Sequence, residues 1–387
     1  MIAYQAVVLG LLLLFFFNVV RNLRDYAPLR EAQSTARANE RLAILIPARN
    51  EADNIGDCLA GLTSQTWREF TVLVLDDDSN DGTAEIVTEI AAQDERVSIL
   101  RGQPIPVGWA GKVWACSQLA EAAQRQEADW LLFLDADTRA RPELAATLLR
   151  HAQDTGAGMV STFPYQVTGS FWEHVVLPML HFLILTFLPI RMVWESNYVG
   201  LVAACGQVEL FSAEAYRRTG GHASIQGSFH DGLQLARRVK ASGMPVRLCD
   251  ASALISCRMY TGGKAVWNGF TRNAYEGLGS VGALAVMTIL QVWLFLTPFL
   301  FLAGGVWRGA HGSDWTSWTA VCAAQVALIL SMRILQARRF GHPESVLLHP
   351  ISIAALVAIQ WASFWKTKRG APVAWKGRAY GKGQQSG

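Results

Sequence analysis

Two separate clusters of aspartates each come directly after an apolar run. Each of the two following loops therefore carries several carboxylates. The clusters are Asp76-Asp77-Asp78 after Phe70–Leu75 and Asp135-Ala136-Asp137 after Trp130–Leu134. Like charges this close together are costly unless a cation, a ligand or solvent offsets them. Carboxylates one residue apart can also face a hard cation that meets phosphate oxygens. We therefore predict a cation and phosphate site, with a solvated acidic turn as the alternative for the first cluster.

The surrounding sequence predicts the sheet that must position these clusters. Between about Leu42 and Asp250, short β-branched apolar runs alternate with helical stretches, as in βαβ units around a parallel sheet. The expected strands are Leu42–Ile46, Phe70–Leu75, Val97–Leu100, Trp130–Leu134 and Gly158–Thr162. Because open α/β sheets bind ligands at the carboxyl ends of their strands, both acidic clusters should lie at one edge of the sheet.

A third polar loop, Pro47-Ala48-Arg49-Asn50-Glu51, follows the first expected strand. It therefore belongs to the same edge as the aspartates, and its carboxylate could meet a ligand there. The alternative is that Glu51 only serves the dipole of the next helix.

Composition adds a membrane component to this domain. The chain of 387 residues is 51% hydrophobic and 17% charged, too apolar for a simple soluble protein. Ile2–Val20 carries no charge and is followed by Arg21 and Arg24, so residues 1–22 are expected to be a transmembrane anchor with a basic cytoplasmic flank. A cleaved signal peptide is the alternative, but no small-x-small cleavage site follows.

Three uncharged runs near the other end predict a carboxy-terminal membrane bundle over residues 280–366: Gly277–Trp307, Trp315–Met332 and Val346–Trp365. A basic tail over residues 367–387 follows. Three full spans would place this tail outside, against the positive-inside rule, so we expect a cytoplasmic tail and one re-entrant segment. Within 171–193, the short run Val175–Ile190 predicts an interfacial helix, with a buried core helix as the alternative.

The net charge of +3 is spread along the chain and gives no reason to expect a nucleic-acid partner. The six cysteines are scattered without the close pairs of thiolate metal sites, which favours buried thiols in a reducing compartment.

The acidic clusters and their order resemble the family 2 glycosyltransferases, inverting enzymes with the GT-A fold. The resemblance implies an α/β fold with a mixed, mainly parallel sheet over residues 40–275, transmembrane helices at both ends, and a nucleotide-sugar donor, expected to be a UDP-sugar. It implies that Asp76 contacts the nucleotide and that Asp135 and Asp137 hold Mg²⁺ or Mn²⁺ with the diphosphate. The expected donor-binding residues are Pro47, Arg49, Glu51, Asp76, Asp78, Lys112 and Asp135.

Two residues depart from the family pattern, and two further residues have roles that the resemblance implies. Asp78 stands where the family more often has glycine, so its role is open. Lys112, in a segment similar to the family's Gly-Lys segment, either meets donor phosphate or is a solvated lysine at a helix start. Phe229-His230-Asp231-Gly232-Leu233 resembles the family's acidic motif and implies Asp231 as general base. His230 replaces the usual first acidic residue, and an N-capping role is the alternative for Asp231.

The segments around Gly108–Ala115, Gly220-Gly221-His222 and Arg258-Met259-Tyr260 resemble bacterial carotenoid glycosyltransferases and, more distantly, hopanoid-associated ones. The Gln-x-x-Arg-Trp motif of processive synthases does not occur after Asp231. The resemblance implies single transfer to a hydrophobic membrane lipid, with His230, Arg258 and Trp267 on the acceptor side. It also implies an integral protein of the bacterial inner membrane whose catalytic domain faces the cytoplasm.

Other functions remain open at this point. The acceptor could be a polyprenyl phosphate or a glycerolipid instead of a terpenoid. A nucleotidyltransferase would need a glycine-rich basic loop after its first strand, which the chain does not have. A non-catalytic sugar-nucleotide sensor would bind donor without transfer, and a transporter is disfavoured because the expected spans carry no ionisable series.

Overall fold

The computed structural model describes residues 2–29, 40–311, 316–370, 373–375 and 378–380. The chain forms two compact units. The helical unit comprises Met1–Asp25, Thr168–Ile190 and Tyr260–Arg369, and the sheet unit comprises Tyr26–Val167, Arg191–Met259 and Gly370–Gly387. Each unit is therefore assembled from separate stretches of the sequence.

A seven-stranded sheet organises the sheet unit, with strand order β3-β2-β1-β4-β8-β6-β9. Its strands are β1 (Leu42–Ala48), β2 (Phe70–Asp76), β3 (Val97–Arg101), β4 (Trp130–Leu134), β6 (Met159–Thr162), β8 (Val208–Ser212) and β9 (Val246–Cys249). β1 to β4 pair in parallel, β8 runs antiparallel to both β4 and β6, and β9 is parallel to β6. The expected mixed, mainly parallel sheet is confirmed.

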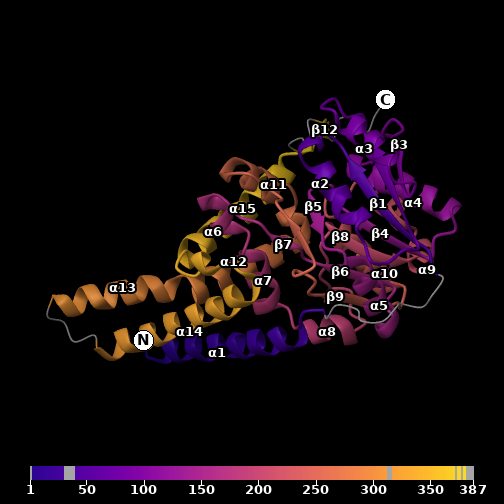
Figure 1. The fold of residues 1–387 in the computed structure, drawn as a ribbon. Helices are drawn as coiled ribbons and strands as arrows, with labels where there is room; N and C mark the ends of the chain where they lie inside the picture. The colour runs from indigo at the N-terminus through magenta and orange to yellow at the C-terminus, as the bar shows by residue number, and fades with distance from the viewer. Residues whose placement is uncertain (1, 30–39, 312–315, 371–372, 376–377, 381–387) are drawn as a thin grey trace. The chain divides into compact units, whose positions relative to one another are not determined.

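Helices cover both faces of this sheet (Figure 1). They are α2 (Ala52–Thr63), α3 (Thr83–Ala91), α4 (Gly111–Arg125), α5 (Leu144–Thr155), α9 (Ala213–Arg218), the 3₁₀ turn η1 (Gly221–Ile225) and α10 (Asp231–Ala241). Along β1, Leu42, Ile44 and Ile46 join the core under α2, α3 and α5, whereas Ala43 and Leu45 join the core under α4 and α10. Alternation in a strand buried on both faces explains its continuous apolar run.

All five expected strands form, with ends shifted by at most two residues. The main correction concerns Pro47 and Ala48, which were expected in the loop but extend β1 in register with Leu75 and Asp76 of β2. β1 pairs with β4 only as far as Leu45. Beyond that point only one side of β1 is paired, a position where a strand accommodates proline.

Two smaller sheets complete this unit. One contains β5 (Thr138–Ala140), β10 (Ile255–Cys257) and β7 (Tyr165–Gln166), and begins just after Asp137. The other is a hairpin of β11 (Val373–Trp375) and β12 (Arg378–Tyr380). The expected basic tail thus contributes two short strands, and its last residues, 381–387, lie outside the described part of the chain.

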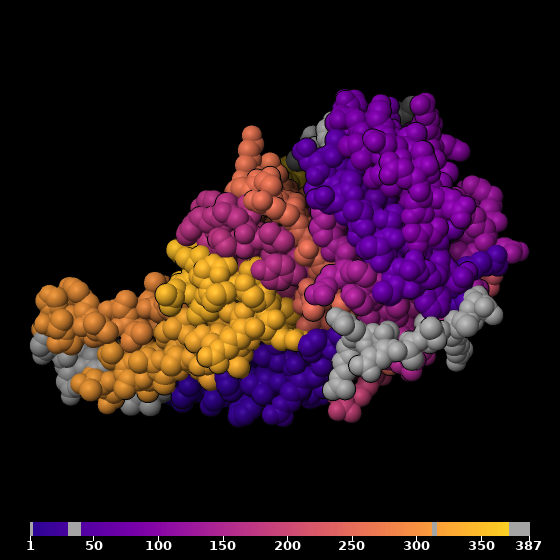
Figure 2. Space-filling view, in the orientation of Figure 1, coloured from indigo at the N-terminus to yellow at the C-terminus, as the bar shows by residue number. Residues whose placement is uncertain are grey.

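The helical unit contains α1 (Ile2–Asp25), α6 (Phe171–Val176), α7 (Met179–Phe187), α11 (Gly263–Leu278), α12 (Val281–Phe295), α13 (Thr297–Ala310), α14 (Thr316–Phe340), the 3₁₀ turn η2 (Pro343–Ser345) and α15 (His349–Lys368). The short helix α8 (Ile190–Glu195) begins at its border. Figure 2 shows α1, in indigo, lying along the orange and yellow carboxy-terminal helices, and α1 packs on α14.

Three helical stretches of the described residues are long and apolar enough to cross a membrane: Ala3–Asp25, Val281–Ala310 and Thr316–Phe340. The third carboxy-terminal run, Val346–Trp365, does form α15 but is not one of them. α15 buries a polar face that includes Ser352, Gln360 and Ser363, which lowers its hydrophobicity. Phe171–Phe187 is apolar but shorter than a span.

Asn22 of α1 fixes the end of α7 within the helical unit. Its side-chain amide donates to the carbonyl oxygens of Leu185 (2.8 Å) and Leu188 (2.7 Å), and its oxygen accepts from the Ile190 amide (3.0 Å). Backbone carbonyl and amide groups at a helix end have no partner within the helix, and they need another hydrogen-bond partner when they are buried. Asn22 is 1% exposed, so water cannot replace it.

Replacing Asn22 with leucine should therefore destabilise the protein, although leucine is of similar size and is compatible with a helix. Leaving these buried backbone groups unpaired costs about 1–3 kcal/mol. We expect a lower midpoint of thermal unfolding in detergent for Asn22→Leu than for the native protein. Phe17→Ala, on an exposed position of the same helix, is the control, and equal losses in the two variants would contradict the capping role.

Candidate active site

The loops that follow β1 and β2 are tied together by hydrogen bonds. The guanidinium of Arg49 donates to the carbonyl oxygens of Asp77 and Asp78, the latter at 2.9 Å. The backbone amide of Asn50 donates to Ser79 Oγ (3.0 Å). Asn50 and Asp78 both adopt positive φ, at 50° and 59°, a conformation that Asn and Asp tolerate better than most residues. The two loops therefore form one preshaped wall.

Glu51 belongs to the same wall and stands at the amino terminus of α2. Its backbone amide donates to Thr83 Oγ1 (2.8 Å), and its carboxylate accepts from Asn54 Nδ2 (2.9 Å). The helix-terminus alternative thus describes part of its role, and donor binding stays a prediction. Asp76, at the end of β2, accepts from the Ser79 amide (3.3 Å), so its carboxylate is held at the carboxyl edge of the sheet.

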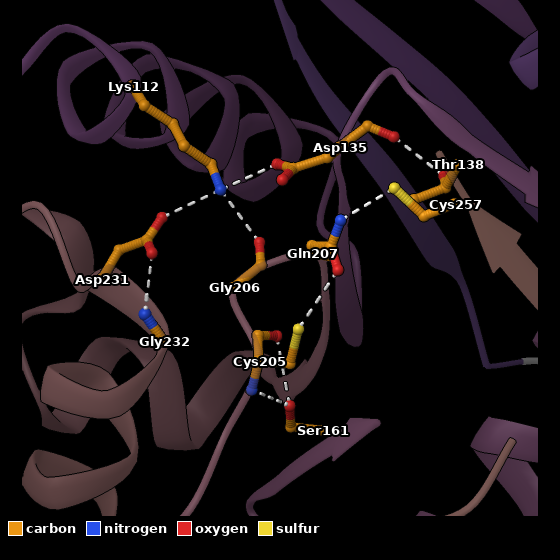
Figure 3. A network of polar contacts seen from close by, with 10 residues as sticks. All are labelled: Lys112, Asp135, Thr138, Ser161, Cys205, Gly206, Gln207, Asp231, Gly232 and Cys257. Atoms are coloured by element: carbon orange, nitrogen blue, oxygen red, sulfur yellow. Dashed lines mark hydrogen bonds and ion pairs between the residues drawn. The ribbon is translucent and has the colours of Figure 1, made fainter. Parts of the chain in front are cut away.

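Lys112, in the first turn of α4, joins the two acidic elements that the sequence kept far apart. Its ammonium lies 2.7 Å from Asp135 Oδ1 and 3.1 Å from Asp231 Oδ2, and donates to the carbonyl oxygen of Gly206 at 2.9 Å. Figure 3 shows the lysine pointing between the two carboxylates. The expected donor side and the expected base therefore meet at one cation.

The electrostatics of this cluster assign charges to its members. Burial opposes the charge on Lys112, but Asp135 and Asp231 raise its pKa well above the usual value. Burial also opposes ionisation of Asp231, yet Lys112 and the neighbouring His222 hold its pKa below the usual value. Burial and the nearby Asp137 raise the pKa of Asp135 to about 6, against the attraction of Lys112. At neutral pH the lysine is charged and Asp231 is ionised.

Two glycines allow Asp231 to reach this position. His230 precedes α10 and Asp231 is the first helical residue, accepting from the amide of Gly232 at 2.9 Å. A Cβ atom on Gly206 would overlap the Asp231 carboxylate, and one on Gly232 would overlap Glu209 Oε1 and the Gly206 backbone. The start of α10 can therefore approach the loop before β8 only with glycine at both places.

The Asp-x-Asp turn has a vacant acceptor on Asp137. Thr138 donates to the carbonyl oxygen of Asp135 (2.8 Å) and closes the turn. Asp137 Oδ1 is buried and has no hydrogen-bond partner among the described residues. Hard oxygen ligands of this kind suit Mg²⁺ or Mn²⁺. The described residues contain no group of three or more His, Cys, Asp or Glu side chains arranged to hold a metal ion.

Glu209 is the residue that the sequence analysis missed. It lies on β8 opposite Phe133 of β4, is 1% exposed, and lines one small cavity with Lys112, Asp135 and Asp231. Its Oε1 has no partner within the described structure. Burial, reinforced by Asp231 and Asp135 against Lys112, raises its pKa well above the usual value. An isolated acid inside the apolar run Val208–Ser212 was the available signal.

His222 faces the same cavity from η1. Its backbone amide donates to the Tyr216 hydroxyl (3.1 Å), and that hydroxyl lies 2.7 Å from His222 Nδ1. Burial lowers the pKa of His222 to about 3, so the ring is neutral. Its Nε2 is buried, has no hydrogen-bond partner among the described residues, and belongs to a residue that lines the cavity with Asp231.

The other expected site residues belong to several different elements. Pro47 lines the same cavity as Lys112 and Asp231. Arg258 follows β10 as an exposed residue of the sheet unit. Trp267 is 41% exposed on α11 of the helical unit. Acceptor-side roles for His230, Arg258 and Trp267 stay predictions.

The pKa of Glu209 predicts a pH-dependent cost in stability. The folded protein retains a proton that the unfolded chain releases above 4.5, the ordinary value for this group, so Glu209 destabilises the fold at neutral pH. Glu209→Gln should raise the midpoint of thermal unfolding at pH 7 by at least about 2 °C.

That gain should shrink to nothing as the pH falls below the ordinary pKa, because both states of the native protein are then protonated at this position. Glu121→Gln, a change at a surface ion pair, is the control and should show no such pH dependence. A gain that is constant across pH would disprove a proton held by Glu209.

Comparison with known proteins agrees with this geometry. Residues 43–209 match the model of glycosyl transferase family 2. The 4,4'-diaponeurosporenoate glycosyltransferase of Staphylococcus haemolyticus is 29% identical over 289 residues, 73% of each chain. The enzyme of the same name from Staphylococcus aureus is 28% identical over 348 residues, 88% of each chain.

Among solved structures, a mannosyltransferase from Pyrobaculum calidifontis, in complex with GDP-Man and Mn²⁺, has a TM-score of 0.56 and 16% identity. The match covers 94% of this chain and 98% of that chain, and shows a common fold. The family match contains both acidic clusters and Lys112 and ends at Glu209, before Asp231. Residues 43–209 therefore form a family 2 glycosyltransferase domain with the GT-A fold, and the chain is a glycosyltransferase.

Proposed function

We propose that the protein transfers one sugar, with inversion, from a nucleotide-sugar donor to a carotenoid or similar terpenoid in the membrane. The observation that carries the reaction type is the joining of Asp135 and Asp231 by Lys112. The two Staphylococcus relatives named for a carotenoid acid support the acceptor class. The apolar helices support an acceptor drawn from the bilayer.

Asp231 is the general base of this proposal. It is buried yet ionised at neutral pH because Lys112 stabilises its charge. It can therefore accept the proton of an acceptor hydroxyl group that approaches the helix start. A carboxylic acid acceptor is already ionised at neutral pH and would need no such base. Base and departing diphosphate must act on opposite sides of the sugar carbon in an inverting transfer. The contacts of Lys112 with Asp135 (2.7 Å) and Asp231 (3.1 Å) support the proposal that both groups serve one site.

The donor half of the site is formed by the first two loops and the Asp-x-Asp turn. Asp135 and Asp137 would hold Mg²⁺ or Mn²⁺, which neutralises charge on a leaving diphosphate when bound. Asp76, held at the edge of the sheet by the Ser79 amide, would contact the nucleotide, which we propose carries uridine. Lys112 balances the carboxylates and so keeps the site from repelling a negatively charged donor.

The two aspartate roles separate in experiment. Asp231→Asn should reduce transfer by at least about 100-fold, because the base is lost, while donor binding in the presence of Mn²⁺ is kept. Asp137→Asn should abolish transfer and also weaken the Mn²⁺-dependent binding. Radiolabelled transfer and calorimetric donor titration report the two properties, and full turnover by Asp231→Asn would sink its assignment as base.

Asp154→Asn is a matched control for both variants. Asp154 forms an i,i+4 ion pair with Arg150 on the surface of α5, away from the acidic clusters in sequence, and its replacement should leave transfer and donor binding unchanged. A similar loss in all three variants would indicate a general effect of removing negative charge.

Membrane placement follows from the spans and their flanking charges. α1 ends with Arg21 and Arg24, and α14 ends with Arg338 and Arg339. If Val281–Ala310 and Thr316–Phe340 both cross, the chain returns to its starting side before α15. We infer that the sheet unit and the basic tail lie on the cytoplasmic side of a bacterial inner membrane, in keeping with the positive-inside rule.

A panel of acceptors identifies the lipid class. The purified protein in membranes is incubated with labelled UDP- and GDP-sugars and, separately, with a hydroxylated carotenoid, a carotenoid acid, a polyprenyl phosphate and a diacylglycerol. We expect labelled product only with a carotenoid and a UDP-sugar, detected by mass analysis. Product with polyprenyl phosphate alone would replace the acceptor assignment, and donor binding without any product would indicate a sensor.

A further inference from the structure

Among the described residues of the helical unit, Arg333, near the end of α14, has the most deeply buried cationic side chain. It is 1% exposed and lies in the helix Thr316–Phe340, one of the three candidate spans. A charge at such a position is expensive, and proteins retain it when a partner or a function offsets the cost. Its partners are therefore decisive.

The partners of Arg333 carry no negative charge. Nη2 donates to Ser345 Oγ (2.9 Å) and to the Ser345 carbonyl oxygen (3.4 Å), and Nη1 reaches Gln336 Oε1 at 3.5 Å. The guanidinium carbon lies 5.5 Å from the centroid of the Phe182 ring. No ion pair joins Arg333 to a carboxylate in the described part of the chain. Its Nε has no hydrogen-bond partner there.

The acidic residue closest to these groups in sequence is committed elsewhere. Glu344 precedes Ser345, but its carboxylate lies 2.7 Å from His174 Nδ1 and 3.6 Å from His342 Nδ1. Its carboxylate therefore faces the rings of His174 in α6 and of His342, which precedes η2. The guanidinium of Arg333 keeps an uncompensated positive charge.

A small cavity lies beside this guanidinium, lined by Pro178, His181, Arg333, Gln336, Ala337, Phe340, His342 and Ser345. None of the lining residues is acidic. The Nε2 amide of Gln336, a residue that is 3% exposed, also has no partner among the described residues. Two buried donors without acceptors, Arg333 Nε and Gln336 Nε2, thus line one cavity.

We propose that this cavity binds an oxyanion, a carboxylate or phosphate at the head of a membrane amphiphile. A guanidinium with a free Nε edge presents the donor geometry that carboxylates and phosphates accept, and charge-assisted bonds of this kind are strong in a dry site. The lining also includes the apolar residues Pro178, Ala337 and Phe340, and the buried ring of Phe182 faces the guanidinium, which favours an anion that carries a hydrocarbon chain.

The proposal is independent of the sugar transfer, because it concerns residues of the helical unit alone. The competing explanation is that Arg333 only pins η2 to α14 through Ser345. The two differ in whether an anion from outside the chain stabilises the protein.

The experiment measures ligand-induced stability of the full-length protein after delipidation in neutral detergent. Oleate, phosphatidylglycerol and inorganic phosphate are the anionic probes, and oleyl alcohol and phosphatidylcholine are their neutral counterparts. We expect an anionic amphiphile to raise the midpoint of thermal unfolding in a saturable way, with at least tenfold tighter binding than its neutral counterpart, and native mass spectrometry to show one retained molecule.

Arg333→Gln should abolish the difference between anionic and neutral probes. Arg338→Gln, the same change at an exposed arginine of the same helix, should leave the difference intact. If Arg333→Gln does not fold, Gln336→Leu takes its place and should weaken anionic binding several-fold while sparing the interaction of Arg333 with Ser345.

The sources of the anion separate by probe. Stabilisation by oleate or phosphatidylglycerol but not by inorganic phosphate supports a lipid head group, and equal stabilisation by inorganic phosphate supports an oxyanion drawn from water. Absence of any anionic preference in the native protein would overturn the proposal. So would the same preference in Arg333→Gln, or in Gln336→Leu where that variant is used.

Discussion

The contact of one ammonium with two carboxylates governs the arrangement of the catalytic unit. Lys112 draws Asp135, at the end of a central strand, and Asp231, at the start of a helix, to the same point. The remaining features accommodate this meeting: glycines at positions 206 and 232 remove the side chains that would block it, and the loop just before the antiparallel strand β8 provides the Gly206 carbonyl that accepts the lysine's third bond. Without the lysine, the buried aspartates would repel each other.

The parts of the fold that follow from local patterns were predictable. β1 and β4 are buried on both faces and so read as continuous apolar runs, and polar loops must then follow at the carboxyl edge. The antiparallel pairing of β8 with β6 was harder to predict, because a long segment of the chain separates the two strands. The end of β1 was misplaced at Pro47, since the sequence does not reveal that pairing with β4 stops at Leu45.

The candidate site was predictable to the extent that its residues occur in motifs. Asp76, Asp135, Asp137 and Asp231 stand at element ends, where the sequence marks them. The partners of Lys112 could not be predicted, because they depend on how α4 and α10 meet over the sheet. Glu209 was missed for the same reason: its raised pKa comes from burial and from the carboxylates of Asp231 and Asp135, whose proximity a single acid in an apolar run does not disclose.

The interleaving of the two units bears on the order in which the protein is made. Residues 168–190 belong to the helical unit but lie between β6 and β8 of the sheet. During synthesis, four parallel strands emerge first, and an apolar segment must then be placed before β8 can pair with β4. The loop that receives Lys112 comes just before β8, and the helix that carries Asp231 comes after it. A nascent chain thus forms the donor-side strands before the residues that complete the reaction centre are synthesised. A protein shortened to end after residue 190 would still contain the apolar helix α1 and the apolar segment 168–190.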